Sequence, residues 1–445
     1  YGHHHPLRPK GQADPLSPAP PRLEVAEPRD ARRQCSRGTR QAGPHRRMAL
    51  AQDEQPAPPS ADVAQLASHD TGDDTMLACS YSRFGGPQVD QVGRIRRPMP
   101  ADLEPGKVLI RVGASSLNPA DYKQRSGEMK LLLSIQFPQV YGFDFAGQVV
   151  ASRDDRWQPD DRVFGMCKGL RRGGLAEYMI VDGDICARTP ANVSDAEAAS
   201  VPLVGITSVL AFRKAGLAEW AKSGARVLVT GGAGGVGSTA IQLAKRMYGA
   251  SFVATTASAG NKAEFCKSLG ADRVVDYRSE DFSKVLASDN EEDRFDFIFD
   301  CIGEGKKCPS LLKSTGTLVS IVTSPSALCL REFLEQSETR KFQRITWGVE
   351  GFLSSAAGAA ILDRVTGAKS LRGKCRGRFF HVIGTGNGDI MEHLAKALAS
   401  GDLKASIDKS YPLLDALQAL KHIESGRAMG KVVVLCSAAS SSPVN

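Results

Sequence analysis

Residues 226–247 read RVLVTGGAGGVGSTAIQLAKRM, and this stretch decides the fold. The β-type run RVLVT leads directly into a glycine-rich turn. A helical pattern follows, with Val236, Ala240, Ile241, Ala244 and Met247 on or near one face. A strand, a glycine-rich turn and a helix in direct succession are typical of a dinucleotide-binding unit. A purely structural turn is the competing interpretation, because glycine-rich loops are common.

Each glycine of the turn has an expected task. Gly232 permits the tight turn, Gly234 lets the backbone approach a pyrophosphate, and Gly237 lets the helix pack closely on the strand. Gly235 and Val236 open the helix, where free N–H groups and the positive end of the helix dipole favour phosphate. These residues are the predicted pyrophosphate contacts.

The end of the next strand indicates which cofactor is bound. NAD sites usually place an acidic residue there to bind the ribose hydroxyls. Residues 255–262 read TTASAGNK and contain no acid. Ser258 can donate a hydrogen bond to a 2′-phosphate and Lys262 can pair with its charge. Lys262 taken alone reads rather as a solvated helix residue, but the missing acid favours NADPH, which the sequence therefore predicts.

The pattern around this unit predicts an α/β protein. Strands are expected at 226–231, 251–256, 273–277, 296–302, 316–322 and 379–385. Helical stretches lie between most of them, which indicates a doubly wound parallel sheet covered on both faces. Short strands at 107–113, 141–151 and 175–181, separated by Gly, Pro and Asp, indicate a β-rich domain before it. A helix at 413–425 and a strand at 431–436 are expected to return to that domain.

The predicted organisation has five segments. They are a disordered extension at 1–75, a β-rich domain at 76–203, a nucleotide-binding domain at 204–401 with an insertion at 324–378, a returning segment at 402–437, and a disordered tail at 438–445.

Charge and cysteine content exclude several classes of protein. The net charge is +8, but residues 1–50 carry ten Lys and Arg against four Asp and Glu. The rest of the chain is nearly neutral, so a nucleic-acid partner is not expected. No uncharged apolar run is long enough for a membrane span. The ten cysteines form no C-x-x-C pair, which indicates mostly buried, reduced thiols.

The composition of the N-terminal segment leaves the compartment open. An Arg-rich opening is typical of an organelle transit peptide, whereas its acidic residues and prolines are not. The prediction is a cytoplasmic protein, or a mitochondrial or chloroplast protein if this segment is a transit peptide.

Further motifs carry a family resemblance. They are SSLNPADYKQRSG (115–127), YGFDFAG (141–147), DDRVFG (160–165), GGLAEYMIV (173–181), VPLVGITS (201–208), CKSLGADRVVDYR (266–278), FDFIFDCIG (295–303) and SGRAMGKVVV (425–434). With the glycine turn, they resemble the quinone oxidoreductase (zeta-crystallin-like) branch of the medium-chain dehydrogenases/reductases. Within that branch the chain is similar to plant alkenal and enone reductases and to reticulon-4-interacting-type oxidoreductases. The resemblance runs from about Cys79 to Leu435.

The resemblance implies a GroES-like catalytic domain built from both chain ends, a Rossmann cofactor domain, and a homodimer. It also implies cofactor contacts. Tyr277 would lie near the adenine or 2′-phosphate with Ser258 and Lys262, and Thr207 and Asn118 near the nicotinamide side. Cys301, Ile302, Gly303, Val322 and Thr323 would line the nicotinamide pocket, with Asn387 and Lys431 as further candidates.

The candidate proton donors come from the same comparison. Many quinone reductases have Tyr two places after the Asp of an N-x-x-D motif, whereas here Tyr122 and Lys123 follow Asp121, so Lys holds that place. Tyr122 or Lys123 can donate a proton. Lys123 reads equally as a residue that orients the cofactor or substrate, or as a solvated surface residue.

A catalytic metal is not expected. Zinc-dependent relatives use Cys and His ligands, but this chain has no His between His69 and His381. Asn118 and residues 142–144 (GFD) stand where those ligands are expected, and Asp144 reads as a structural hydrogen-bond acceptor.

The chemistry that remains is hydride transfer to an acceptor that stabilises the added charge itself. Quinones and α,β-unsaturated carbonyl compounds do so by delocalisation. The predicted function is a zinc-independent, NADPH-dependent quinone or enone reductase. Two alternatives stay open, namely a trans-2-enoyl thioester reductase and a weakly catalytic NADPH-binding sensor or assembly factor.

Overall fold

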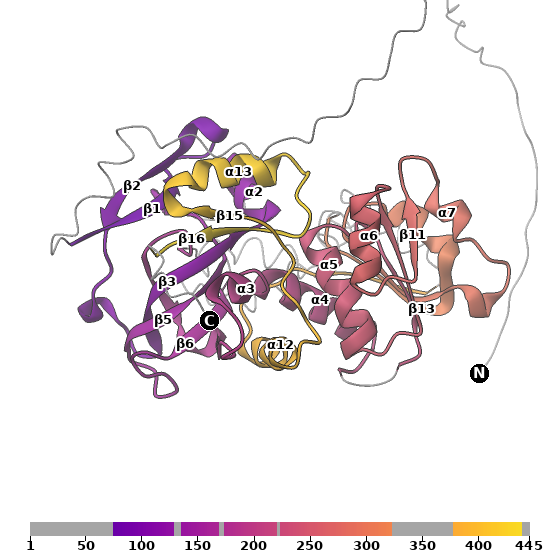
Figure 1. Cartoon of the computed structure of the whole chain (residues 1–445), viewed down its shortest axis with the longest axis horizontal. Coiled ribbons are helices and arrows are strands. Elements are labelled where there is room, and N and C mark those ends of the chain that lie inside the picture. The colour runs from indigo at the N-terminus through magenta and orange to yellow at the C-terminus, as the bar shows by residue number, and fades with distance from the viewer. Residues whose placement is uncertain (1–73, 129–134, 169–172, 220–222, 323–376, 438–445) are drawn as a thin grey trace, which may run out of the picture. The chain divides into compact units, whose positions relative to one another are not determined.

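A computed structural model describes residues 74–128, 135–168, 173–219, 223–322 and 377–437 of the 445-residue chain (Figure 1). Nearly all of the predicted N-terminal extension, nearly all of the insertion and the C-terminal tail lie outside these residues. Within the described ranges, none of the helices has the length and hydrophobicity of a transmembrane segment.

The part predicted to bind the dinucleotide, called the nucleotide-binding part below, is a six-stranded parallel sheet with the order β11-β10-β9-β12-β13-β14. The strands are β9 (Arg226–Val229), β10 (Phe252–Ala257), β11 (Arg273–Asp276), β12 (Phe295–Asp300), β13 (Leu312–Ser320) and β14 (Arg378–His381). Every described pair in this sheet is parallel. The predicted doubly wound α/β sheet is confirmed.

Apolar runs form these strands because both faces of the sheet are buried. Val227 and Val229 of β9 lie in one hydrophobic core, whereas Leu228 between them lies in another. In β12, Ile298 likewise joins the core of Leu228. Alternate residues of a strand point to opposite faces, so a continuous apolar run supplies both cores at once.

The helices of this part are α4 (Pro202–Lys214), α5 (Gly235–Gln242), α6 (Asn261–Ser268), α7 (Phe282–Val285) and α12 (Gly388–Ser400). Helix α5 packs on β9 and on α4. It continues into a π-helical turn, η4 (Leu243–Met247). Gln242, at the end of α5, pairs with both the backbone N–H and the carbonyl of Lys404, which anchors the segment after α12.

The β-rich part holds a seven-stranded sheet and a three-stranded sheet. The larger has the order β15-β16-β3-β5-β6-β8, with β7 paired to β3; the smaller has the order β2-β1-β4. Their strands are β1 (Thr75–Tyr81), β2 (Asp90–Arg96), β3 (Lys107–Leu117), β4 (Gln139–Val140), β5 (Asp144–Ser152), β6 (Arg162–Met166), β7 (Tyr178–Asp182), β8 (Cys186–Arg188), β15 (Ile407–Pro412) and β16 (Lys431–Leu435). The helices are α2 (Pro119–Ser126), α3 (Asp195–Ala199) and α13 (Ala416–Glu424).

The predicted strands differ from the observed ones by one to four residues at one or both ends, and two boundary shifts have local reasons. The strand predicted over 141–151 begins only at Asp144, because Gly142 takes a positive φ of 92°. The helix predicted over 413–425 starts with a 3₁₀ turn, η9 (Leu413–Asp415), before α13. The residue limits proposed for the five segments stay predictions.

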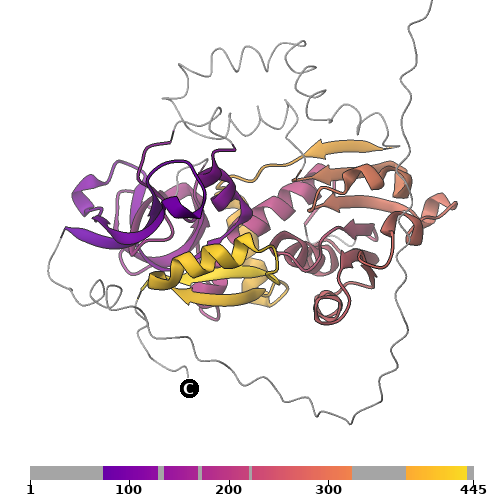
Figure 2. The same cartoon turned by 90° about the horizontal axis from the view of Figure 1, so that it is seen from above.

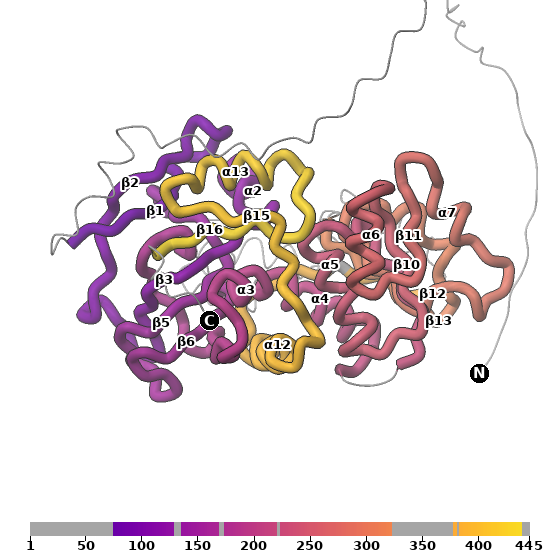
Figure 3. Tube along the Cα trace, in the orientation of Figure 1, coloured from indigo at the N-terminus to yellow at the C-terminus, as the bar shows by residue number. Residues whose placement is uncertain are grey.

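The C-terminal strand connects the two parts. Strand β16 pairs antiparallel with β3, with Val432 opposite Leu117 (Figure 3). Figure 2 shows the yellow C-terminal elements beside the purple N-terminal ones, and α13 packs on α2. Just before β16, the backbone of Gly430 bridges to Gly234 of the glycine turn. The start of β16 is therefore attached to both the seven-stranded sheet and the glycine turn.

Candidate active site

The glycine turn between β9 and α5 is shaped by contacts that only glycine tolerates. Gly231 takes a positive φ of 70°, and its carbonyl accepts the N–H of Gly234, so Gly232 is a central residue of this tight turn. Gly232 also has no room for a side chain, since a Cβ on it would collide with the Thr255 hydroxyl. A Cβ on Gly237 would collide with the carbonyl oxygen of Gly231, so Gly237 does allow the close packing of helix on strand.

Gly234 is the open position of the turn. A Cβ there would meet only the Gly231 carbonyl oxygen, at 3.5 Å. Gly234 is also the N-cap of α5, and its carbonyl accepts the first helical bond, from Ser238 N–H. The N–H groups of Val236 and Gly237 come before that bond, so they have no acceptor within the helix. An open backbone face with free donors at a helix N-terminus fits the pyrophosphate of a dinucleotide.

A pocket of about 360 Å³ lies at the carboxyl ends of β10, β11 and β12. Its lining residues are Thr256, Tyr277, Arg278, Ser279, Glu280, Asp281, Phe282, Ile302, Glu304 and Lys307. Tyr277 is 55% exposed and Ile302 is 47% exposed. Thr256 links this pocket to the glycine turn, because its hydroxyl accepts the N–H of Gly231 at 2.9 Å. In a doubly wound sheet the crevice at the carboxyl ends of the strands is where ligands bind.

The residues predicted for the 2′-phosphate surround the end of β10. Ser258 is buried directly after Ala257, whose register partner in β11 is Asp276, the residue before Tyr277. The Lys262 ammonium donates a hydrogen bond to the backbone carbonyl of Arg427 at 2.9 Å. Neither Ser258 nor Lys262 lines the pocket, whereas Arg278 does and was missed from the sequence. The signal for Arg278 was available, since it is a cation directly after the candidate Tyr277.

Asp300, at the end of β12, is a second residue that sequence reasoning missed. Its fully buried carboxylate accepts hydrogen bonds from the hydroxyls of Thr230 and Ser320, both at 3.0 Å. It also accepts the backbone N–H groups of residues 302–305 at 2.9–3.4 Å. One carboxylate thus fixes the loop 301–305 against the ends of β9 and β13. The sequence did carry a signal for this residue, because an acidic residue ends the apolar run of β12.

The loop after β12 presents apolar side chains at the edge of the turn. Ile302 lies over Gly231, where an added Cβ would collide with its side chain. Val322 is 41% exposed and lies near Gly303. Burial, and secondarily Asp300, raises the pKa of the Cys301 thiol well above its usual value, so this thiol stays neutral. Thr323 lies outside the described residues.

Two other predicted cofactor contacts, Thr207 and Asn387, lie within α4 and at the start of α12. Thr207 is buried in α4, and a Cβ on Gly384 would approach its hydroxyl to 2.9 Å. The Asn387 side-chain carbonyl accepts the N–H of Ile390 at 3.0 Å and so caps α12. Asn387 therefore has a structural task that the sequence interpretation did not include.

Asn118, Asp144 and Lys431 form one buried polar network. The Lys431 ammonium donates to the Leu117 carbonyl at 3.1 Å, to Asn118 Oδ1 at 2.5 Å and to Asp144 Oδ2 at 3.2 Å. Asp144 also accepts from Asn118 Nδ2 and the Ser116 hydroxyl, both at 2.8 Å. All three N–H donors of Lys431 are therefore engaged. Asp144 has the role of hydrogen-bond acceptor expected of it.

The candidate proton donors lie on α2, whose N-cap is Asn118. Tyr122 follows Asn118 by four residues, so the two share a face of this short helix. Burial raises the pKa of the Tyr122 phenol, and the carboxylates of Glu424 and Glu128 raise it further. Tyr122 therefore keeps its proton through the neutral range. Lys123 is half-buried, and within the described residues its ammonium makes no hydrogen bond or ion pair.

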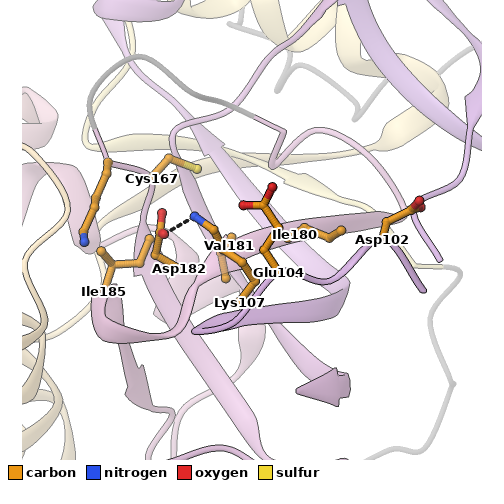
Figure 4. Close-up of a pocket in the computed structure, with 9 residues that line it drawn as sticks. Asp102, Glu104, Lys107, Cys167, Ile180, Val181, Asp182 and Ile185 are labelled. Atoms are coloured by element: carbon orange, nitrogen blue, oxygen red, sulfur yellow. Dashed lines mark hydrogen bonds and ion pairs between the residues drawn. The ribbon is translucent and has the colours of Figure 1, made fainter. Parts of the chain in front are cut away.

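A second pocket, of about 250 Å³, lies in the β-rich part and contains none of the predicted site residues (Figure 4). In Figure 4 the Lys107 amine points at Asp182, with which it forms an ion pair. Lys168, which also lines this pocket, pairs with Asp184 at 2.6 Å. Both lysines of this pocket are held in ion pairs and none of the predicted site residues lines it, so we do not assign it to the reaction.

The donor set around Asp144 does not fit zinc. Asp144 is surrounded by an amide, a hydroxyl and an ammonium, and the ammonium would compete with a cation. Among the described residues no three His, Cys, Asp or Glu side chains are grouped so as to hold a metal ion. The seven described cysteines are all free thiols, and six of them are buried.

Comparison with known proteins agrees with this arrangement. Residues 104–191 match the family described as alcohol dehydrogenase GroES-like domain, and residues 269–434 match zinc-binding dehydrogenase. The chain is 34% identical over 369 residues to 2-methylene-furan-3-one reductase of Solanum lycopersicum, covering 81% of this chain and 79% of that protein. It is 32% identical to the chloroplastic NADPH-dependent alkenal/one oxidoreductase of Arabidopsis thaliana, with the same coverage.

A solved structure agrees in fold. The quinone oxidoreductase from Coxiella burnetii matches with a TM-score of 0.62 at 28% sequence identity. The match covers 82% of this chain and 100% of that one. The likeness thus extends over both the β-rich and the nucleotide-binding parts.

Proposed function

Because this chain belongs to the medium-chain dehydrogenase/reductase superfamily, we propose that it is an NADPH-dependent reductase of quinones or α,β-unsaturated carbonyl compounds. One observation carries the proposal: an open glycine turn at the N-terminus of α5 lies next to a pocket at the ends of β10–β12. The names of the relatives, an alkenal/one oxidoreductase and a furanone reductase, support the acceptor class.

Residues of three segments would hold the cofactor. The N–H groups of Val236 and Gly237 would bind the pyrophosphate, and Tyr277 would face the adenosine. Ser258, Lys262 and Arg278 would bind the 2′-phosphate, which favours NADPH over NADH. Bound there, the nicotinamide would supply a hydride to the acceptor.

The chain's own side chains would orient the acceptor and return a proton. Ile302 and Val322 present exposed apolar surface beside the glycine turn, which favours a flat apolar acceptor and excludes water from it. Tyr122 is our candidate for the proton donor, because its raised pKa keeps the phenol protonated and α2 holds it on the face of Asn118. Lys123 is the second candidate on the same helix.

We propose that the reaction proceeds without zinc, although one matched family carries the description zinc-binding dehydrogenase. The support is the donor set around Asp144 described above. Quinones and enones need no Lewis acid of the kind that an unactivated alcohol requires, since they delocalise the charge that they receive.

A turnover assay tests the proposed function. Purified protein is mixed with NADPH and a panel of quinones, alkenals, enones and trans-2-enoyl thioesters, and NADPH absorbance is followed. Oxidation with quinones or enones supports the proposal. Oxidation with thioesters alone assigns the protein to thioester reduction. NADPH binding without oxidation of any acceptor identifies a sensor or assembly factor and overturns the proposal.

Two further properties belong to the proposal. We infer a homodimer, which light scattering would detect as twice the mass of the chain. We also infer location in an organelle, supported by the chloroplastic relative; a fluorescent protein fused to the C-terminus of the full-length natural protein would locate it, and a cytoplasmic signal would contradict this inference.

A further inference from the structure

Lys431 connects four segments that come from distant parts of the chain. Its backbone N–H donates to the Ser406 carbonyl at 2.7 Å, and the preceding Gly430 donates to the Ala233 carbonyl at 2.9 Å. Its aliphatic stem lies under the glycine turn, since a Cβ on Gly235 would stand 3.0 Å from Lys431 Cδ. The side chain thus runs from the turn that would bind pyrophosphate towards strands β3 and β5 of the seven-stranded sheet.

The far end of this side chain holds the start of α2. Lys431 Nζ donates to Asn118 Oδ1, and Asn118 is the N-cap of α2. The Asn118 backbone N–H donates to Asp121 Oδ2 at 2.9 Å, and Asp121 lies in the first turn of the same helix. A displacement of Lys431 would therefore move the N-terminus of the helix that carries Tyr122 and Lys123.

Asp144 connects this network to a further segment, helix α4. Its Oδ1 accepts the N–H of Leu203 at 2.8 Å, in the first turn of α4, which carries Thr207. The network is closed to water, with Lys431 3% exposed and Asp144 fully buried. Burial lowers the pKa of the Lys431 ammonium, whereas the Asp144 carboxylate opposes that shift. A buried charged pair whose hydrogen bonds are all satisfied is rigid. Any movement that breaks one of its contacts leaves a buried charged or polar group without a partner, which costs free energy.

We propose that Lys431, held by Asp144 and Asn118, is a positioning residue that couples the glycine turn to α2. Cofactor on the turn then orders the helix that carries the candidate proton donor. This inference rests on the proposed function for its kinetic consequence. Its structural consequence needs only that NADPH binds. Lys431 itself would contact neither the nicotinamide nor the acceptor, because all three of its side-chain N–H donors are engaged inside the protein.

Lys431→Met tests the proposal, because Met keeps an unbranched stem and removes the three donors. Lys107→Met is the matched control, since Lys107 also lies in the seven-stranded sheet and also pairs with a single Asp, Asp182, away from the glycine turn. For Lys431→Met we expect kcat to fall roughly tenfold to a hundredfold through misplacement of α2, with the NADPH dissociation constant changed less than about threefold. For Lys107→Met we expect an unchanged kcat.

Hydrogen exchange provides a readout that does not depend on turnover. In the wild-type protein, NADPH should slow amide exchange both in residues 231–238 and in α2. In Lys431→Met it should slow exchange only in residues 231–238. Protection of α2 that persists in Lys431→Met would overturn the proposal, as would a kcat equal to that of Lys107→Met.

A double variant separates positioning from stability. Lys431→Met with Asp144→Asn removes the unpaired carboxylate, so the melting temperature should recover towards that of wild type while kcat stays low. If the melting temperature and kcat recovered together in the double variant, the proposal would be overturned. Failure of the proposed function looks different: wild-type protein then oxidises no NADPH with any acceptor, while the exchange experiment still reports on the coupling. If wild type turns over and all Lys431 variants match the control, only the coupling fails.

Discussion

The side-chain ammonium of Lys262 donates a 2.9 Å hydrogen bond to the backbone carbonyl oxygen of Arg427. Lys262 lies in α6 of the nucleotide-binding part, and Arg427 lies in the segment between α13 and β16. The residue expected to recognise a 2′-phosphate thus already has a neutral acceptor. A phosphate would replace this uncharged acceptor with an anion, so the ammonium would gain an ion pair in addition to its hydrogen bond.

Cofactor preference is the first prediction from this contact. Lys262→Ala should raise the NADPH dissociation constant by roughly one decade and leave that of NADH nearly unchanged. Titration of protein fluorescence with each dinucleotide measures both constants. Lys267→Ala is the control, because Lys267 lies on the same helix and pairs with Glu264 at 2.9 Å. Equal weakening of NADPH and NADH in Lys262→Ala would contradict the assignment, as would equal affinities in wild type.

Two alanine substitutions in the glycine turn should behave oppositely. Gly234→Ala should keep the wild-type melting temperature, because its Cβ has room, but should lose most NADPH affinity by blocking the approach of the pyrophosphate. Gly237→Ala should lower the melting temperature itself, since its Cβ would collide with the Gly231 carbonyl; steric strain of this kind typically costs about 1–3 kcal/mol. Thermal melts with and without NADPH distinguish the two. Normal NADPH binding by Gly234→Ala would contradict the site.

The sheet of the nucleotide-binding part could be predicted because its signal is local. Val227, Leu228 and Val229 form a continuous apolar run, and a strand buried on both faces requires such a run. The backbone conformation within the turn could not be predicted. Gly231 and Gly232 are adjacent and chemically identical, so the sequence could not tell which of them takes the positive φ.

The contacts within the site that could not be predicted are long-range. Lys431 and Asn118 are 313 positions apart, and their hydrogen bond exists only because β16 pairs with β3. The sequence indicates that Asp300 ends a strand. Its role in holding residues 302–305 depends on the loop conformation, in which backbone N–H groups donate to the Asp300 carboxylate. Arg278 becomes a candidate only when the pocket at the ends of β10–β12 is seen.

The pH dependence of turnover tests Tyr122. Because burial and two carboxylates raise its pKa above the ordinary value of 10.0, the phenol remains a donor at every pH below that value. Loss of proton donation by Tyr122 should therefore appear only above pH 10. Tyr122→Phe should lower kcat for an enone by about 10²-fold or more. An alkaline loss of kcat with a midpoint near neutrality, absent in Tyr122→Phe, would contradict this pKa. A full loss in Lys123→Met with none in Tyr122→Phe would assign the proton to Lys123.

Metal removal gives a further prediction. Dialysis against a strong zinc chelator should leave both kcat and the melting temperature unchanged, because Asp144 is paired with the Lys431 ammonium and its other partners are uncharged. Elemental analysis of the untreated protein should find less than stoichiometric zinc. Activity that is lost on chelation and restored by added zinc would show that the donor set has been misjudged.

We propose that this chain transfers a hydride from NADPH to a conjugated acceptor. The most direct measurement uses NADPH that carries deuterium at the transferable position of its nicotinamide, with an α,β-unsaturated ketone as acceptor. Mass spectrometry and NMR then locate the label in the product. We predict one deuterium, at the carbon β to the carbonyl, with the carbon–carbon double bond reduced and the carbonyl intact. Deuterium on the carbonyl carbon would identify a ketone reductase, and oxidised NADPH without label in the product would show that no direct hydride transfer takes place; either result contradicts the account.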